Sequence, residues 1–229
     1  MKRWVLLGCF LLTCSATYAN GHLYQISTIS QLSAGEFKGV ETLRDLRQKG
    51  TFGLGSFHNL DGEMVILSGN INRINSEGKV STPSLSTTKA SFAMIVEFRG
   101  EAMIDPPEGA SLNKLYLLLD ERLSDKRSVY AIKISGTFSS LKLRSVPAQQ
   151  PPYPTLQEVI KNQSVWTVQN QRGTLVGFWC PDLFEGVSPP GYHFHFIADN
   201  HRTGGHVLDA VLERGVIELQ RITEFTIEN

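Results

Sequence analysis

The sequence predicts an α+β protein in which strands dominate and helices are few. Most apolar residues occur in short alternating or continuous runs that end at Gly, Pro, Asn or Asp, a pattern typical of strands joined by turns. Hydrophobic residues make up 41% of the 229 residues, and no long polar tract separates them. The chain can therefore bury one sizeable core or form two closely joined lobes.

Strand-like patterns occupy most of the chain up to about residue 145, with helical patterns between and after them. Strands are expected over Leu23–Ile29, Glu63–Leu67, Asn70–Val80 with a Ser-Glu-Gly turn, Ser91–Phe98, and Ser128–Thr137 with a continuation through Lys142–Arg144. Helices are expected at the end of Ser33–Lys49, over Leu112–Arg122 and over Leu156–Gln163.

Turn-forming residues divide the second half of the chain. An Asn-Gln-Arg-Gly motif and an Arg-Gly motif each predict a hairpin. The expected hairpins pair Ser164–Asn170 with Gly173–Trp179, and Ala210–Glu213 with Val216–Leu219. Four prolines predict an irregular connection near residues 145–155, which we interpret as the junction between two lobes.

The N-terminus has the features of a secretory signal. Lys2 and Arg3 precede the apolar run Trp4–Leu12, and small residues lead to Ala19. The run is too short to span a membrane, so cleavage after Ala19 and export of a domain over residues 20–229 are expected. Without residues 1–19 the chain carries 20 basic and 22 acidic residues, a net charge of −2. This balance argues against a nucleic-acid partner, which would require a basic stripe.

Cys180 is the only cysteine after residue 19, so no intrachain disulfide is possible in the exported domain. It lies between Trp179 and Pro181, close in sequence to a group of histidines. Either it is a small buried hydrophobic residue, which we favour, or it is a fourth ligand of a metal site.

The segment Gly191–Asp209 contains the strongest functional signal. His193 and His195 are two residues apart, so in a strand they point to the same face. Turn formers follow, and a hairpin that places His206 opposite His195 would bring a third imidazole onto that face. Three histidines with an open fourth position are typical of catalytic Zn²⁺. His201 is the competing third ligand, but we prefer His206 because His201 lies at the expected loop tip.

Two charged residues are candidates to act beside such a metal. Glu63 directly follows an Asp-Gly turn and begins an apolar strand, where its charge would be costly unless it served a metal or carried a proton. A solvated carboxylate at the strand end is the alternative. Arg144 precedes the proline-rich segment, and its guanidinium suits a carboxylate or an enolate.

Several stretches together resemble the bacterial acetolactate decarboxylases. The matching pieces are GLGSFHNLDGEMVILSG (residues 53–69), ASFAMIVEF (90–98), RSVPAQQPPYPTL (144–156) and GTLVGFWCPDLFEGVSPPGYHFHFIADNHRTGGHVLD (173–209). The resemblance implies a two-lobed α+β fold, a homodimer, Zn²⁺ on His193, His195 and His206, and active-site roles for Glu63 and Arg144. Ser56 stands where the family usually has Thr and keeps the hydroxyl group, so the resemblance implies a catalytic role for Ser56 as well.

Two features of the sequence depart from the family's pattern. Cys180 stands where the family commonly has Thr. The family also contributes a further acidic residue near its C-terminus. Glu218, Glu224 and Glu228 are the acidic residues in this part of the chain, and none of them matches a motif.

The implied substrate is a small 2-hydroxy-3-keto acid, 2-acetolactate, and the implied product is acetoin. Zn²⁺ would polarise the hydroxyl and ketone oxygens and stabilise the enediolate. Arg144 would hold the carboxylate, and Glu63 would manage the proton delivered to carbon. The rival hypotheses are a non-catalytic metal- or ligand-binding protein on the same scaffold and a zinc hydrolase.

Overall fold

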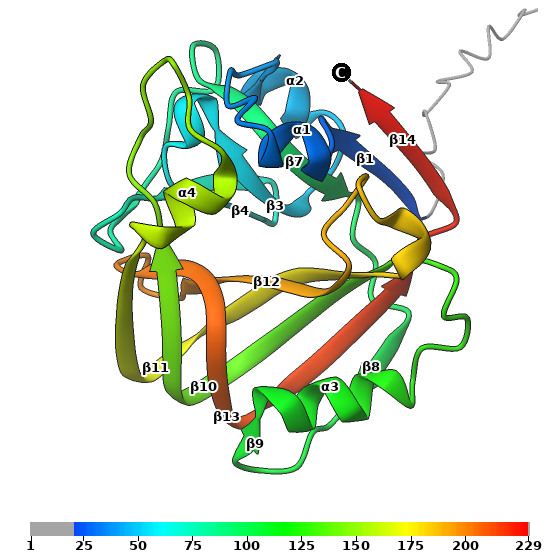
Figure 1. Cartoon of the computed structure of the whole chain (residues 1–229). Helices are drawn as coiled ribbons and strands as arrows, with labels where there is room; N and C mark the ends of the chain where they lie inside the picture. Colours follow the sequence, from blue (N-terminus) through cyan, green and yellow to red (C-terminus); the bar gives the residue numbers. More distant parts are fainter. Residues whose placement is uncertain (1–20, 229) are drawn as a thin grey trace, which may run out of the picture.

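The computed structural model describes residues 21–228 and contains two β-sheets that face each other (Figure 1). The predicted secretory signal lies outside the described residues. The eight-stranded sheet has the order β14-β1-β7-β3-β4-β5-β6, with β2 paired to β7. Its strands are β1 (His22–Ile26), β2 (Glu41–Thr42), β3 (Phe52–Phe57), β4 (Glu63–Leu67), β5 (Asn70–Ile74), β6 (Val80–Ser81), β7 (Lys89–Val96) and β14 (Glu224–Glu228).

The six-stranded sheet has the order β10-β11-β12-β13-β8, with β9 paired to β13. Because β10 also pairs with β13, strands β10 to β13 form a closed ring. The strands are β8 (Ala102–Ile104), β9 (Ala110–Ser111), β10 (Tyr130–Ser145), β11 (Ser164–Cys180), β12 (Gly191–Ala198) and β13 (Gly204–Arg221). The α-helices are α1 (Ile29–Ser33), α2 (Leu43–Arg47), α3 (Leu112–Asp120) and α4 (Leu156–Lys161).

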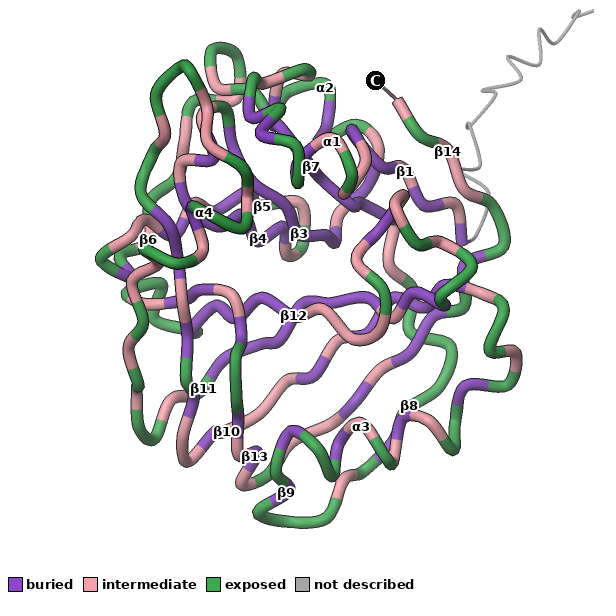
Figure 2. The backbone as a smooth tube through the Cα atoms, in the orientation of Figure 1, coloured by how far each residue is buried: buried purple, intermediate pink, exposed green. Residues whose placement is uncertain are grey.

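Three apolar clusters hold these layers together. One fills the interior of the six-stranded sheet and includes Leu115 and Leu119 of α3. The second lies between the two sheets, and the third lies between the eight-stranded sheet and α2. Figure 2 shows buried residues along β3, β7 and β12 and exposed residues in the connecting loops. The α+β class, the predominance of strands and the small number of helices are confirmed.

Both predicted hairpins outside the histidine segment are wrong. β11 and β13 each continue as one unbroken strand through the residues of the predicted turn. The glycines that suggested turns are strand residues. Gly136 of β10 is in register with Gly173 of β11 and Gly215 of β13. A Cβ atom at any of the three would lie 2.2–2.4 Å from a neighbouring backbone oxygen. Glycine is therefore required here for close strand approach rather than for chain reversal.

Other predicted boundaries need smaller corrections. The predicted helix within Ser33–Lys49 is limited to α2, and Val40 lies outside it with 43% exposure. Residues near Ile29 form α1 instead of extending the first strand. The predicted lobe junction near residues 145–155 stays a prediction, and these residues link β10 to β11 of the same sheet. Within residues 21–228, no helix has the length and apolar character needed to cross a membrane.

The close strand contacts at Gly136, Gly173 and Gly215 lead to a prediction about stability. Gly136→Ala places a Cβ 2.2 Å from the backbone oxygen of Arg214, so the strands must move apart. We expect the free energy of unfolding to fall by about 1–3 kcal/mol, as in other overpacked interiors. Lys142→Ala, at an exposed position of the same strand, is the control and should change it by less than about 0.5 kcal/mol. Urea denaturation measures both, and equal effects would contradict the interpretation.

Candidate metal centre and active site

The strand register of the six-stranded sheet brings three of the predicted site residues into one row. His195 of β12 lies opposite His206 of β13, and His206 lies opposite Arg144 of β10. Directly opposed residues share a face, and His193 joins this face because it is two residues from His195. The predicted hairpin pairing of His195 with His206 is thus confirmed.

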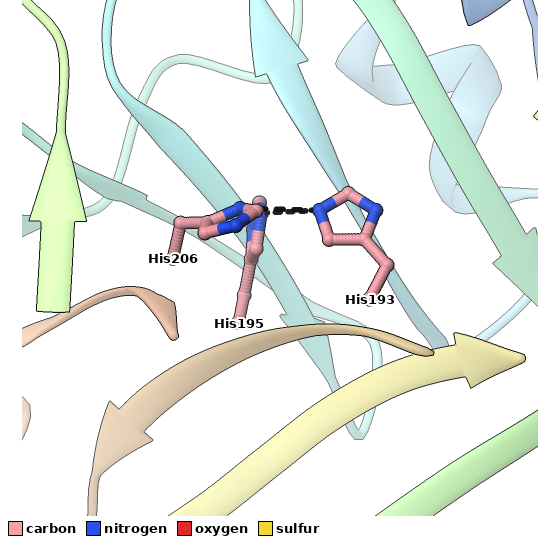
Figure 3. A group of neighbouring side chains, drawn as sticks. All are labelled: His193, His195 and His206. Carbon is pink, nitrogen blue, oxygen red and sulfur yellow. Dashed lines mark hydrogen bonds between the residues drawn. The ribbon is translucent and has the colours of Figure 1, made fainter. Parts of the chain in front are cut away.

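The three imidazoles converge on one point (Figure 3). Nε2 of His193 lies 3.2 Å from Nε2 of His195 and 3.2 Å from Nδ1 of His206. The remaining edge, from His206 Nδ1 to His195 Nε2, is 3.3 Å. Tetrahedral Zn–N bonds of about 2.0–2.1 Å would separate the nitrogens by about 3.3–3.4 Å. The triangle therefore has the dimensions of a three-histidine metal site.

The Nδ1 atoms of His195 and His193, which point away from the shared point, support this interpretation. His195 Nδ1 lies 2.8 Å from the backbone oxygen of Met64, so Nδ1–H donates and Nε2 keeps its lone pair for a metal. Nδ1 of His193 is buried and has no hydrogen-bond partner in the described part of the chain. Hydrogen bonding elsewhere therefore does not account for the orientation of the His193 ring.

Burial keeps the three histidines in the form that binds metal. Desolvation holds the pKa values of His193 and His206 well below the ordinary value, and the neighbouring positive groups lower them further. Desolvation also lowers the pKa of His195, although the carboxylate of Glu63 opposes that shift. Neutral imidazoles are good ligands for divalent transition metals, so this donor set fits such an ion.

The eight-stranded sheet supplies the acidic side of the site. Glu63 begins β4, lies opposite Ser56 of β3, and is only 6% exposed. Its Oε1 accepts a hydrogen bond of 3.0 Å from Nη1 of Arg144, and its Oε2 lies 3.3 Å from Nε2 of His195. The alternative of a solvated carboxylate is therefore wrong. The buried charge is compensated by the guanidinium of Arg144, while Oε2 faces the metal-facing nitrogen of His195, where a bound cation would add positive charge.

Ser56 lies at the same cavity but is engaged in the strand network. Its Oγ is 2.9 Å from Oγ of Ser91, which donates to the backbone oxygen of Phe57 at 2.8 Å. The sequence analysis did not single out Ser91, although β3 and β7 are neighbours in the sheet. The catalytic role of Ser56 stays a prediction.

All six predicted site residues line one cavity of about 230 Å³ between the sheets. The other wall of the cavity is mainly apolar. It is formed by Ile29, Leu32, Leu60, Phe92, Val146, Leu156, Pro189 and Tyr192. None of these residues was predicted from the sequence. Leu60, Val146 and Tyr192 were detectable, because each lies within three residues of a predicted site residue, but the others come from segments whose proximity only the fold reveals.

The two alternative ligands do not join the histidine group. His201 is exposed on the turn between β12 and β13 with φ 51°, as its expected loop position indicated. Cys180 is 2% exposed and interacts with Ser188. Within the described residues, the group that could hold a metal comprises His193, His195 and His206.

The fold and this site define a small-molecule enzyme with a three-histidine donor set for a divalent metal at the cavity. The chain belongs to the alpha-acetolactate decarboxylase family, whose model matches residues 23–229. It is 40% identical over 210 residues to the alpha-acetolactate decarboxylase of Methanosarcina mazei, covering 92% of this chain and 73% of that protein. It is 38% identical over 206 residues to the Brevibacillus brevis protein of the same name, and the match covers 90% of this chain and 72% of that protein.

A solved structure agrees with this assignment. The crystal structure of alpha-acetolactate decarboxylase from Bacillus subtilis strain 168 superposes with a TM-score of 0.88 at 29% identity. The match covers 90% of this chain and 88% of the other. The proteins of this family are carboxy-lyases, and this chain is accordingly an enzyme of that class.

The three-histidine group predicts that metal binding depends on His206 but not on His201, which lies outside the group. Loss of a group one step beyond the ligands typically weakens metal affinity about 10–100-fold, so His206→Ala should weaken it by more than about 100-fold. His201→Ala is the control and should bind as the unmodified protein does. Zinc titration by calorimetry measures both affinities. Retention of tight one-to-one binding by His206→Ala would refute the ligand assignment.

The burial of Cys180 predicts low thiol reactivity. Desolvation raises the pKa of this thiol to about 12, partly offset by a hydrogen bond with Ser188. Iodoacetamide at pH 8 should therefore label the folded chain lacking residues 1–19 at least about tenfold more slowly than the urea-unfolded chain, as followed by mass spectrometry. Because the pKa in the folded protein exceeds the ordinary value of 9.0, the thiol's contribution to stability is complete below about pH 9 and is lost as the pH rises towards 12.

Proposed function

We propose that this chain decarboxylates 2-acetolactate to acetoin with Zn²⁺ held by His193, His195 and His206. The observation that carries the proposal is the triangle of imidazole nitrogens next to the buried Arg144–Glu63 pair, in a member of the acetolactate decarboxylase family. When bound, the ion supplies a Lewis acid for the hydroxyl and ketone oxygens of the substrate. Three neutral nitrogen ligands leave its positive charge unneutralised.

Arg144 binds the leaving carboxylate. Its guanidinium lies on the cavity wall beside His206, is only 15% exposed, and presents further N–H groups besides the one bonded to Glu63. It orients the carboxylate so that the bond between C2 and the carboxyl carbon breaks. The electron pair passes to the ketone, which becomes an enediolate, and CO₂ leaves.

Glu63 delivers the proton that completes the reaction. After loss of CO₂, C2 needs one proton to give acetoin. Glu63 lies between Arg144 and His195, and both of its oxygens are within 3.3 Å of these side chains. The carboxylate is thus held at the cavity wall, where it takes up a proton from solvent, passes it to C2 and returns to its charged form.

Export and dimerisation are further parts of the proposal. The N-terminal pattern supports cleavage after Ala19, and the family resemblance supports a homodimer. Cell fractionation with N-terminal sequencing tests the first. Light scattering of the purified protein tests the second.

The proposed chemistry gives a direct assay. Acetoin should form from racemic acetolactate, stop when a chelator removes the metal, and return when Zn²⁺ is added. Ester hydrolysis without acetoin release would favour the zinc hydrolase, and metal binding without turnover would favour a binding protein. Either result would overturn the proposed reaction.

Glu63→Gln tests the proton-transfer role. The substitution keeps the shape of the side chain but removes the exchangeable carboxyl proton, so kcat should fall about 10²–10⁴-fold with the zinc content unchanged. Glu121→Gln, at an exposed position beyond α3, is the matched control and should retain full activity. Unchanged turnover of Glu63→Gln would remove Glu63 from the mechanism.

A further inference from the structure

The turn that leads into Glu63 has an unusual backbone. Asn59 and Leu60 both have left-handed φ angles, of 65° and 55°, and Gly62 follows with φ 85°. Asn tolerates this region, but it is costly for Leu, at about 1–2 kcal/mol per residue. Such a conformation persists only where surrounding contacts hold it, and it often occurs next to functional sites. Here its result is that the buried Leu60 side chain lines the cavity.

The contacts that hold the turn meet at Asn59. Its N–H donates to the backbone oxygen of Phe37 at 2.7 Å, and its own backbone oxygen accepts from the N–H of Gln149 at 2.7 Å. Its side-chain Oδ1 accepts a 2.5 Å hydrogen bond from the hydroxyl of Tyr153. The Tyr153 ring also contacts Phe37 edge to face, with the ring centroids 5.5 Å apart.

These bonds join three segments that are distant in sequence, and each segment carries part of the apolar cavity wall. The segment that ends at Phe37 follows α1, which supplies Leu32. The turn supplies Leu60. The proline-rich segment, which contains Tyr153, lies between Val146 and Leu156. Most of the polar wall is made by β10, β12 and β13, although Glu63 begins β4 directly after the same turn.

We propose that the Tyr153–Asn59 hydrogen bond is a latch that positions the apolar wall over the reacting carbon, which makes both residues positioning residues of the decarboxylase. This inference rests on the proposed function. The enediolate left by loss of CO₂ is planar at C2, and protonation on either face gives a different enantiomer of acetoin. A rigid apolar wall excludes water from the face opposite the proton donor. The latch therefore controls the enantiomeric purity of acetoin as well as the rate.

Two substitutions remove the same bond from opposite ends. Tyr153→Phe deletes only the hydroxyl group, and Asn59→Gly removes the acceptor together with the rest of the side chain while still allowing the positive φ. Each should lower kcat about three- to tenfold, the range expected for one hydrogen bond, and lower the enantiomeric excess of acetoin. Zinc content should not change, because neither residue belongs to the histidine group.

The double variant tests whether the two residues act as one unit. Its kcat and enantiomeric excess should match those of either single variant, because the second substitution finds no bond left to remove. Tyr130→Phe is the matched control. It removes a hydroxyl that bonds Asp125 N–H at 2.9 Å, and this residue does not line the cavity. It should lower the melting temperature without changing kcat or enantiomeric excess.

The outcomes separate the latch from the proposed function. If the unmodified protein forms acetoin and both single variants match its kcat and enantiomeric excess, the latch is overturned. Effects that multiply in the double variant would also overturn it. If the unmodified protein forms no acetoin, the proposed function fails. In that case amide hydrogen exchange decides on the latch, because Tyr153→Phe should speed exchange at Asn59 and Gln149, and unchanged exchange would overturn it.

Discussion

A buried carboxylate paired with a guanidinium from the opposite sheet is the constraint on which the site depends. Glu63 belongs to one sheet, whereas Arg144 and the histidines belong to the other. The carboxylate loses its hydration when the sheets pack, and this cost is tolerable only if Arg144 lies within hydrogen-bonding range. The spacing of the two sheets and the geometry of the site are therefore coupled. The bond from His195 to the Met64 backbone oxygen connects the same two layers a second time.

The cavity has two chemically different walls because two different kinds of structure build it. The polar wall is a row of strand residues, held by backbone ladders that allow little displacement. Apart from Phe92 of β7 and Tyr192 of β12, the apolar wall comes from short helices, a turn and irregular segments, which lack such ladders and must be held by other contacts. The network around Asn59 meets this need for one part of the wall. A polar wall for binding charge and an apolar wall for excluding water suit a reaction that forms CO₂ and a short-lived carbanion equivalent.

Sequence reasoning identified the residues of the polar wall but not their surroundings. His193 and His195 were detectable from strand alternation, and the turn residues between them and His206 indicated the hairpin. Glu63 and Arg144 stood out as charges next to apolar strands. In contrast, Gly173 of β11 and Gly215 of β13 gave a false signal, because a glycine in a turn and a glycine at a close strand contact look the same in one sequence. The hydrogen-bonding role of Asn59 was equally hidden, since its partners are 22 to 94 residues away.

By itself the sequence determined the α+β class, the chemical types of the site residues and the local face that each occupies, because strand periodicity and turn chemistry act over a few residues. Tertiary structure alone decided that β11 and β13 continue through their glycines, that the two sheets face each other, and that Glu63 meets Arg144 and His195. These features depend on pairing between residues far apart in the chain. Their energies come from burial and charge compensation between layers, which no local pattern encodes.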